Sequence, residues 1–171
     1  IKYGFRGINF SAISACASAS HSIGSSYNII KDNQADIMIA GGSEATITPM
    51  AVAGFSNMKA LTKNPNPNIA CRPFDKLRDG FVIGEGAGVL VLEELKSAKI
   101  RGAEIIAEII GYGASADAFH LTSPNPDGIG AQLCMQLCLD NAKILPSSIN
   151  YINTHGTSTH LNDKIETKAI K

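Results

Sequence analysis

The sequence has little of what marks a nucleic-acid-binding or membrane protein. Its 171 residues carry 15 Lys and Arg against 15 Asp and Glu, so the formal net charge is zero. A nucleic-acid-binding domain usually has a basic excess, and none is present. No apolar run is long enough to cross a bilayer as a helix, and the N-terminus lacks the pattern of a secretory signal. We therefore expect no nucleic-acid partner, no membrane span and no secretion.

Cysteine is scarce and shows no C-x-x-C pair; the four cysteines are Cys16, Cys71, Cys134 and Cys138. Cys134 and Cys138 are four residues apart and share one face of a helix. A metal site there would need two further ligands, which the sequence does not offer. The spacing is also not that of a disulfide framework. We predict buried free thiols, no metal, and a reducing compartment.

The apolar pattern alternates between strands and helices. Strands are predicted at 7–14, 35–42, 86–95, 103–115 and 149–156, and helices at 16–32, 49–60, 94–102, 128–142 and 162–171. Residues 62–79 are rich in Asn, Pro and charge and are predicted as a loop. This alternation indicates an α/β fold with a largely parallel sheet. The polar loop at 116–127 predicts two parts, 1–115 and 116–171. The chain starts at Ile1 without Met and ends in a predicted helix, so we expect a fragment of a longer protein.

The segment SACASASHSIG places Cys16 between a predicted strand and a predicted helix. At a helix N-terminus, free backbone N–H groups and the macrodipole favour an anion such as a thiolate. The small neighbours leave room for a substrate and let N–H groups approach an oxyanion. The alternative interpretation is a thiol packed in an Ala/Ser-rich helix start, and the local pattern does not separate the two.

A second candidate site is NTHGTSTHLND, where a predicted strand ends at His155 beside Gly156. A His in that place suits proton transfer or donation to a developing oxyanion, and Thr157 and Thr159 can bind an amide-bearing ligand. The alternative is a polar loop that caps the following helix. A third segment, RPFDKLRDG, carries Arg and Asp in one loop, and an ion-paired structural role is favoured for it.

These segments, in this order, resemble the elongating β-ketoacyl-acyl carrier protein synthases. The motifs that carry the resemblance span essentially the whole chain and are SACASASHSIG, ADIMIAGGSEA, RPFDKLRDGFVIGEGAGVLVLEEL, DAFHLTSP and NTHGTST. The implied fold is thiolase-like, with two related α/β halves in alternating layers. This chain would hold the later part of the first half and the start of the second.

The resemblance implies an acyltransferase that builds fatty acid chains. Cys16 would take an acyl group from an acyl carrier protein. Malonyl-carrier protein would then lose CO2, and its carbanion would attack the acyl-Cys, giving a 3-oxoacyl chain two carbons longer. No cofactor is implied, because the substrates carry phosphopantetheine. The implied partners are loaded acyl carrier protein and a second copy of the chain in a homodimer.

Site residues follow from the resemblance by position. Cys16 matches the family's nucleophile, and the Cys16 backbone N–H would be one of the oxyanion donors. His155 matches the first of two active-site histidines. The side chains implied to bind substrate are Thr157, Thr159, Thr122 and Phe55. Lys59 and Lys63 fall where basic residues face the acidic carrier protein, although a solvated loop is the competing interpretation.

The sequence departs from the family pattern at His160, where Pro usually follows HGTST. The family's second His, its catalytic Lys and its second oxyanion donor fall beyond Lys171, so we expect no condensation by these residues alone. Open alternatives are a ketosynthase domain of a multidomain polyketide or fatty acid synthase, a thiolase acting on coenzyme A esters, a non-catalytic chain-length subunit, and a binding protein. The compartment is expected to be a bacterial cytoplasm or a plastid-type organelle.

Overall fold

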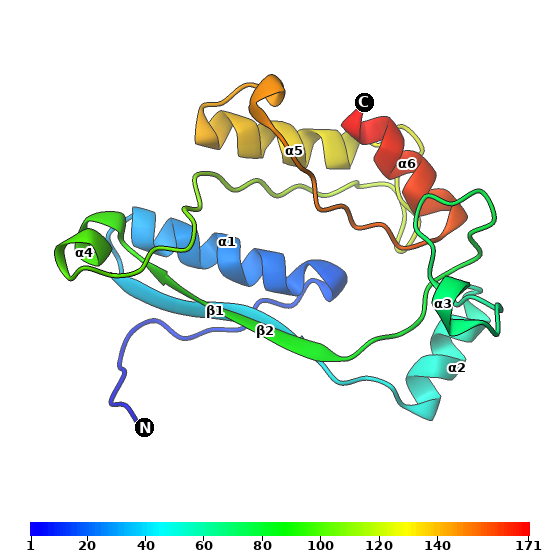
Figure 1. Cartoon of the computed structure of the whole chain (residues 1–171), viewed down its shortest axis with the longest axis horizontal. Helices are drawn as coiled ribbons and strands as arrows, with labels where there is room; N and C mark the ends of the chain where they lie inside the picture. Colours follow the sequence, from blue (N-terminus) through cyan, green and yellow to red (C-terminus); the bar gives the residue numbers. More distant parts are fainter. The chain divides into compact units, whose positions relative to one another are not determined.

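The computed structural model describes residues 1–171, whose helices and strands are labelled in Figure 1. These residues divide into two compact units. The first unit consists of Ile1–Glu44 and Gly86–Tyr112, and the second of Ala45–Glu85 and Gly113–Lys171. The chain therefore passes between the units three times. None of the helices combines the length and apolar character that a bilayer crossing requires.

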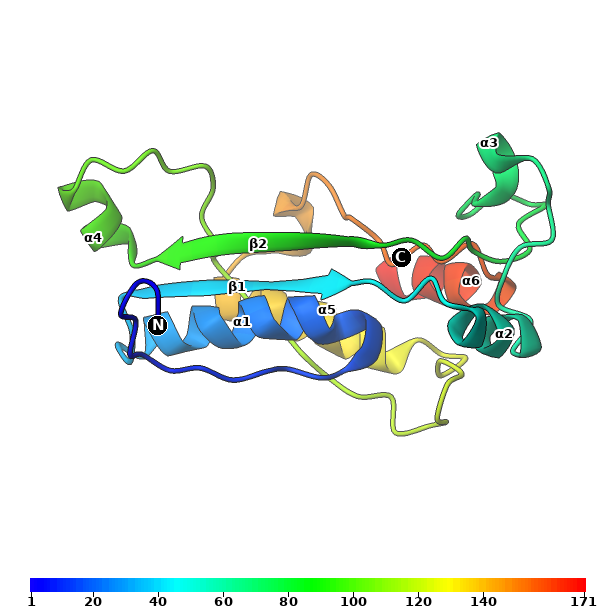
Figure 2. The same ribbon diagram turned by 90° about the horizontal axis from the view of Figure 1, so that it is seen from below.

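The first unit is built on a pair of antiparallel strands with one helix along one face (Figure 2). Strand β1 pairs with β2 from Ile37 opposite Glu93 to Glu44 opposite Gly86. Met38 and Ala40 alternate along β1 and are buried. This period of two directs one face of the pair toward helix α1. The elements of this unit are η1 (Ala15–Ala17), α1 (Ser18–Lys31), β1 (Ile37–Glu44), β2 (Gly86–Glu93) and α4 (Leu95–Ile100).

The antiparallel pairing corrects the prediction of a largely parallel sheet. Apolar residues on both sides of a strand suggested burial on both faces, as in parallel sheets. In this unit, however, Val89 and Val91 of β2 are 65% and 67% exposed. Strand direction depends on the path of the chain between the strands, which the apolar pattern does not encode. Here residues 45–85 leave the unit and return before β2 begins.

Three predicted strands, at 7–14, 103–115 and 149–156, have no strand pairing. A strand exists only where another backbone completes its ladder of hydrogen bonds, and β1 and β2 form the only sheet. The segment before Gly113 instead lies against α1. The Tyr27 hydroxyl donates to the Ile110 carbonyl at 3.2 Å, and the Tyr112 ring occupies the space beside Gly24.

The second unit is helical and loop-rich. Its elements are α2 (Pro49–Asn57), α3 (Pro67–Ala70), α5 (Ile129–Ala142), η2 (Pro146–Ser148) and α6 (His160–Ile170). Helix α2 starts as its sequence predicts, with the Thr48 side chain accepting from the Ala51 N–H at 3.3 Å and Pro49 in the first turn. The predicted loop at 62–79 contains the one-turn helix α3, because Asn66 caps it by accepting from the Asn68 N–H.

The two cysteines of α5, Cys134 and Cys138, are half-buried rather than buried. The Cys134 thiol donates to the Gly113 carbonyl with 3.2 Å between the heavy atoms. Burial raises the pKa of Cys134 above its ordinary value, and the neighbouring Cys138 adds to the rise. All four cysteines are free thiols.

Candidate active site

Cys16 lies on a sharp turn in the first unit, at the centre of η1 and immediately before α1. Its side chain is exposed. The preceding residue, Ala15, has φ = +49°, in the left-handed region that residues with a Cβ seldom adopt. Such a conformation persists only where the surrounding structure holds it. The turn therefore presents the Cys16 thiol at the start of a helix, where an anion is favoured.

Three polar side chains hold this turn. The Ser14 N–H donates to the Ser18 hydroxyl at 2.9 Å, and that hydroxyl donates to the Ala15 carbonyl at 2.8 Å. The Ser14 hydroxyl and His21 Nδ1 are 2.7 Å apart and share a hydrogen bond. None of these residues was predicted as part of the site. Their spacing of four and seven residues, which places them on one helical face, is the signal that could have found them.

In the second unit, Glu166 of α6 fixes the backbone of the loop that carries His155. One carboxylate oxygen accepts from the His155 N–H at 2.6 Å, and the other from the Gly156 N–H at 2.9 Å. Gly156 has φ = +50°, a conformation that glycine adopts without strain. The imidazole of His155 takes no part in these bonds, and the residue is exposed. Glu166 was not predicted from the sequence, because it lies 11 residues after His155, outside the HGTST motif.

A buried centre lies beneath the same loop. Ser158 and Asp163 are 0% and 1% exposed. One carboxylate oxygen of Asp163 accepts from the Ser158 N–H at 3.1 Å and the other from the Phe74 N–H at 2.7 Å. Arg78 completes the charge balance, with Nε 3.4 Å from Asp163 Oδ2. These bonds to the buried Asp163 carboxylate hold the loop against the start of α6.

The RPFDKLRDG segment supports this loop from the other side. The Arg72 N–H donates to the Ser158 hydroxyl at 3.1 Å, and the Gly80 N–H to the Ser158 carbonyl at 2.8 Å. Arg78 donates to the carbonyls of Thr159 and His160 at 3.0 and 2.9 Å. The ion-paired structural role predicted for this segment is confirmed.

The two threonines predicted to bind substrate lie side by side. Thr157 and Thr159 are half-buried, and their hydroxyl oxygens are 2.7 Å apart. Thr159 is the N-cap residue of α6 by position, but its side chain makes no capping hydrogen bond and is bonded to Thr157 instead. His160 is the first residue of α6 and is exposed.

The remaining predicted residues also lie in the second unit. Thr122 is in an exposed loop, where its N–H donates to His120 Nδ1 at 3.1 Å. Phe55 of α2 packs edge-on against Phe81, with ring centroids 5.5 Å apart, and stays 37% exposed. Phe55 is thus partly packed and partly exposed.

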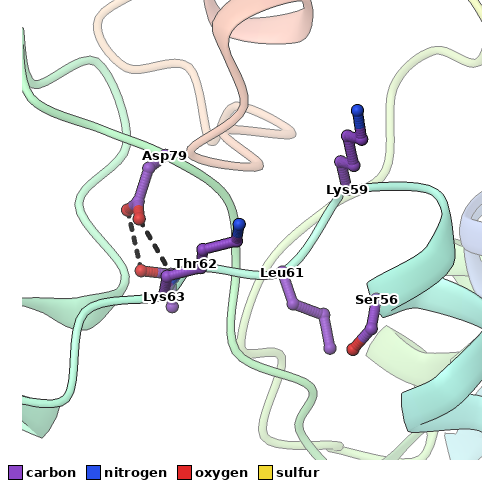
Figure 3. A pocket seen from close by; sticks show the side chains of 6 residues that line it. All are labelled: Ser56, Lys59, Leu61, Thr62, Lys63 and Asp79. Carbon is purple, nitrogen blue, oxygen red and sulfur yellow. Dashed lines mark hydrogen bonds between the residues drawn. The ribbon is translucent and has the colours of Figure 1, made fainter.

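Lys59 and Lys63 line a single pocket of about 280 Å³ (Figure 3). The Asp79 carboxylate accepts from the Lys63 N–H at 3.0 Å and from the Thr62 hydroxyl at 2.7 Å. These bonds, together with the nearby Arg72, lower the pKa of Asp79. The lining of the pocket therefore includes two lysines and one carboxylate that is already bonded to a backbone N–H and a hydroxyl.

The structure brings His155, Thr157 and Thr159 together in one loop, and Lys59 and Lys63 in one pocket. Cys16 belongs to the other unit, with Ser14, Ser18 and His21 around it. No group of three or more His, Cys, Asp or Glu side chains is placed to hold a metal ion.

Comparison with known proteins gives matches to two family descriptions. Residues 1–98 match the family described as Beta-ketoacyl synthase, N-terminal domain, and residues 106–171 match its C-terminal domain. The chain is 52% identical over 171 residues to 3-oxoacyl-[acyl-carrier-protein] synthase 2 of Staphylococcus aureus, covering all of this chain and 42% of that protein. It is 51% identical to the mitochondrial 3-oxoacyl-[acyl-carrier-protein] synthase of Arabidopsis thaliana, covering 38% of it. The chain thus spans about two-fifths of the length of these relatives.

Solved structures agree in fold. A type II polyketide ketosynthase, determined in complex with its acyl carrier protein, superposes with a TM-score of 0.90 at 41% identity, covering 94% of this chain and 40% of that one. The predicted α/β, thiolase-like fold is confirmed.

Proposed function

The chain belongs to the beta-ketoacyl synthase family, and from that premise we propose that the protein is a 3-oxoacyl-acyl-carrier-protein synthase. In the proposed reaction, the Cys16 thiolate attacks the thioester of acyl-carrier protein and releases the carrier's thiol. Malonyl-carrier protein then loses CO2, and the resulting carbanion attacks the acyl-Cys carbonyl and expels the thiolate. The product is a 3-oxoacyl chain two carbons longer.

The observation that carries this proposal is the turn at Cys16. The thiol is exposed at the start of α1, and the Ala15 conformation beside it is held by named hydrogen bonds. A merely packed thiol needs neither exposure nor a strained neighbour. We assign the Cys16 N–H as one donor to the oxyanion that forms when the thioester carbonyl is attacked.

We assign His155 to the condensation half of the reaction, where it donates to the enolate that forms as CO2 leaves. Its fixed backbone and free imidazole support that role. Thr157 and Thr159 would bind the amides of the phosphopantetheine arm, and Thr122 would line the same tunnel. Phe55, which is 37% exposed, would line the acyl pocket. No metal or cofactor is needed for these steps.

We propose the acyl carrier protein as partner, with Lys59 and Lys63 at its contact. The S. aureus relative is named for a carrier-linked substrate, and a structural neighbour was solved with its carrier. We also propose a homodimer, a boundary between halves at residues 115 and 116, and a bacterial cytoplasm or a plastid-type organelle as the compartment. The relatives named here are bacterial and mitochondrial.

A second candidate is a polyketide ketosynthase, because the structural neighbour with a TM-score of 0.90 is bound to a hexaketide. The two candidates share the Cys16 chemistry and differ in the chain that is extended. A thiolase acting on coenzyme A esters is disfavoured by the HGTST segment, whose thiolase counterpart is a different His motif.

The test is intact-mass analysis of the full-length protein after mixing with acyl-carrier protein. We expect a mass gain equal to the acyl group, and none in Cys16→Ala. Cys71→Ala is the matched control, because Cys71 is also an exposed free thiol; it should acylate like the wild type. Acylation of Cys16→Ala, or none of the wild type with an intact donor, would refute the proposal. Offering octanoyl- and acetoacetyl-carrier substrates then separates fatty acid from polyketide extension.

A further inference from the structure

Helix α1 and strand β1 pack closely together at a glycine. Gly42 follows Met38 and Ala40 at a spacing of two, so it faces α1. A Cβ atom built on Gly42 would lie 2.8 Å from the Ala19 Cβ and 3.4 Å from the Ala19 Cα. Carbon atoms in contact are normally about 3.5 to 4.0 Å apart. Any larger residue at position 42 therefore requires the start of α1 to move away from β1.

The residue that Gly42 contacts is tied closely to Cys16. Ala19 is the second residue of α1, three positions after Cys16. The turn between them is cross-linked, because the Ser14 N–H donates to the Ser18 hydroxyl and the Ala17 N–H donates to the Ser14 carbonyl. Because these hydrogen bonds constrain the turn, we expect a displacement of Ala19 to displace Cys16 as well.

We propose that Gly42 is a positioning residue for Cys16, acting through its contact with Ala19. This inference rests on the proposed function, in which Cys16 carries the acyl group. Attack on a thioester requires the reacting atoms to be aligned, and a misplacement of about 1 Å can cost on the order of 100-fold in rate. The three atoms nearest to a Cβ on Gly42 all belong to Ala19, so the expected effect of a larger residue runs through the placement of α1.

The chain offers a matched control directly across the ladder. Gly88 pairs with Gly42, but a Cβ built on Gly88 meets nothing within 4 Å. Gly88→Ala therefore makes the same chemical change on the same strand pair without touching α1. Ala in place of Gly within a strand is otherwise neutral to favourable.

The experiment uses the full-length protein as Gly42→Ala, Gly88→Ala, Ala19→Gly and the Ala19→Gly/Gly42→Ala double variant. The single-turnover rate of acyl transfer to Cys16 is measured beside the thermal midpoint. We expect Gly42→Ala to lose roughly ten- to 100-fold in rate, Gly88→Ala to match the wild type, and the double variant to regain most of the loss. Removing the Ala19 methyl group restores the space, and a general loss of stability would not respond to it.

A wild-type rate in Gly42→Ala, or a double variant as slow as Gly42→Ala with both folded, would overturn the inference. If Gly42→Ala does not fold, recovery of folding and rate in the double variant supports the contact, and failure of both refutes it. Iodoacetamide alkylation of Cys16 relative to Cys71 separates this inference from the proposed function. Absence of acylation in the wild type would count against the proposed function alone. The alkylation ratio would still report whether Gly42→Ala changes the position of Cys16 and whether the double variant restores it.

Discussion

Arg78 and Asp163 form an ion pair, with Arg78 Nε 3.4 Å from the Asp163 carboxylate; the carboxylate is 1% exposed and the Arg78 side chain 16%. The same carboxylate also accepts the backbone N–H groups of Ser158 and Phe74. The pair thus joins the segment before β2 to the loop that carries His155. Charges with this degree of burial are costly to leave without a partner.

Asp163→Asn should destabilise the full-length protein by about 1 to 3 kcal/mol, because the amide NH2 cannot accept one of the two N–H groups that the buried carboxylate accepts. The half-buried Arg78 also loses its counter-charge. The matched control is Lys168→Gln, which breaks the Lys168–Asp127 pair, whose side chains are 54% and 70% exposed. An ion pair exposed on both sides contributes little to stability, so that change should cost far less. Urea unfolding monitored by circular dichroism measures both, and equal losses in the two variants would contradict the prediction.

His160→Pro should stabilise the protein by about 0.4 to 1 kcal/mol. His160 is the first residue of α6, where the N–H has no partner within the helix and proline fits. Thr159 before it has φ = −94° and ψ = 151°, which suits the residue preceding a proline. The carbonyl that accepts from Arg78 is kept. Differential scanning calorimetry should show a higher midpoint, and a lower one would indicate a role for the His160 side chain or N–H.

Gly24→Ala should destabilise the protein by about 1 to 3 kcal/mol through overpacking. A Cβ on Gly24 would overlap the Tyr112 ring, which packs directly on α1. Gly54 provides the contrast, because it is also inside a helix, and its Cβ would meet nothing within 4 Å. Gly54→Ala should gain about 0.5 to 1 kcal/mol from helix propensity. Relative to the wild type, we expect the thermal midpoint to fall in Gly24→Ala and to rise in Gly54→Ala. Shifts in the same direction would contradict the packing argument.

The contribution of Asp79 should depend on pH. Its pKa is lowered from 3.8 by the Lys63 N–H, the Thr62 hydroxyl and Arg72, so the native state favours the ionised carboxylate. The stabilisation is therefore fully present above the unfolded pKa and is lost as pH falls through the lower, folded pKa. Unfolding free energies of wild type and Asp79→Asn between about pH 7 and pH 3 should converge at the acid end. A difference that stays constant across this range would show that the effect is not one of charge.

Helices could be predicted from the sequence because their signals are local. The apolar spacing around Ile23, Tyr27 and Ile30 predicted α1 within about two residues at each end, and Pro49 marked the start of α2. The motifs around Cys16 and His155 were also visible, because each lies within a dozen consecutive residues. That was enough to identify the family and the fold.

The strand pairing, and the contacts that hold the site residues in place, could be found only in the tertiary structure. The antiparallel register joins residues up to 56 positions apart, from Ile37 to Glu93, and three apolar segments predicted as strands have no partner to pair with. Phe74 meets Asp163 across 89 positions, and Gly42 meets Ala19 on a different element. Periodicity reports which side of an element is apolar, but not what lies against it. The sequence alone therefore determined which residues are chemically able to act, and the tertiary structure decided what holds them in place, because a hydrogen bond or a close contact needs both partners positioned in space.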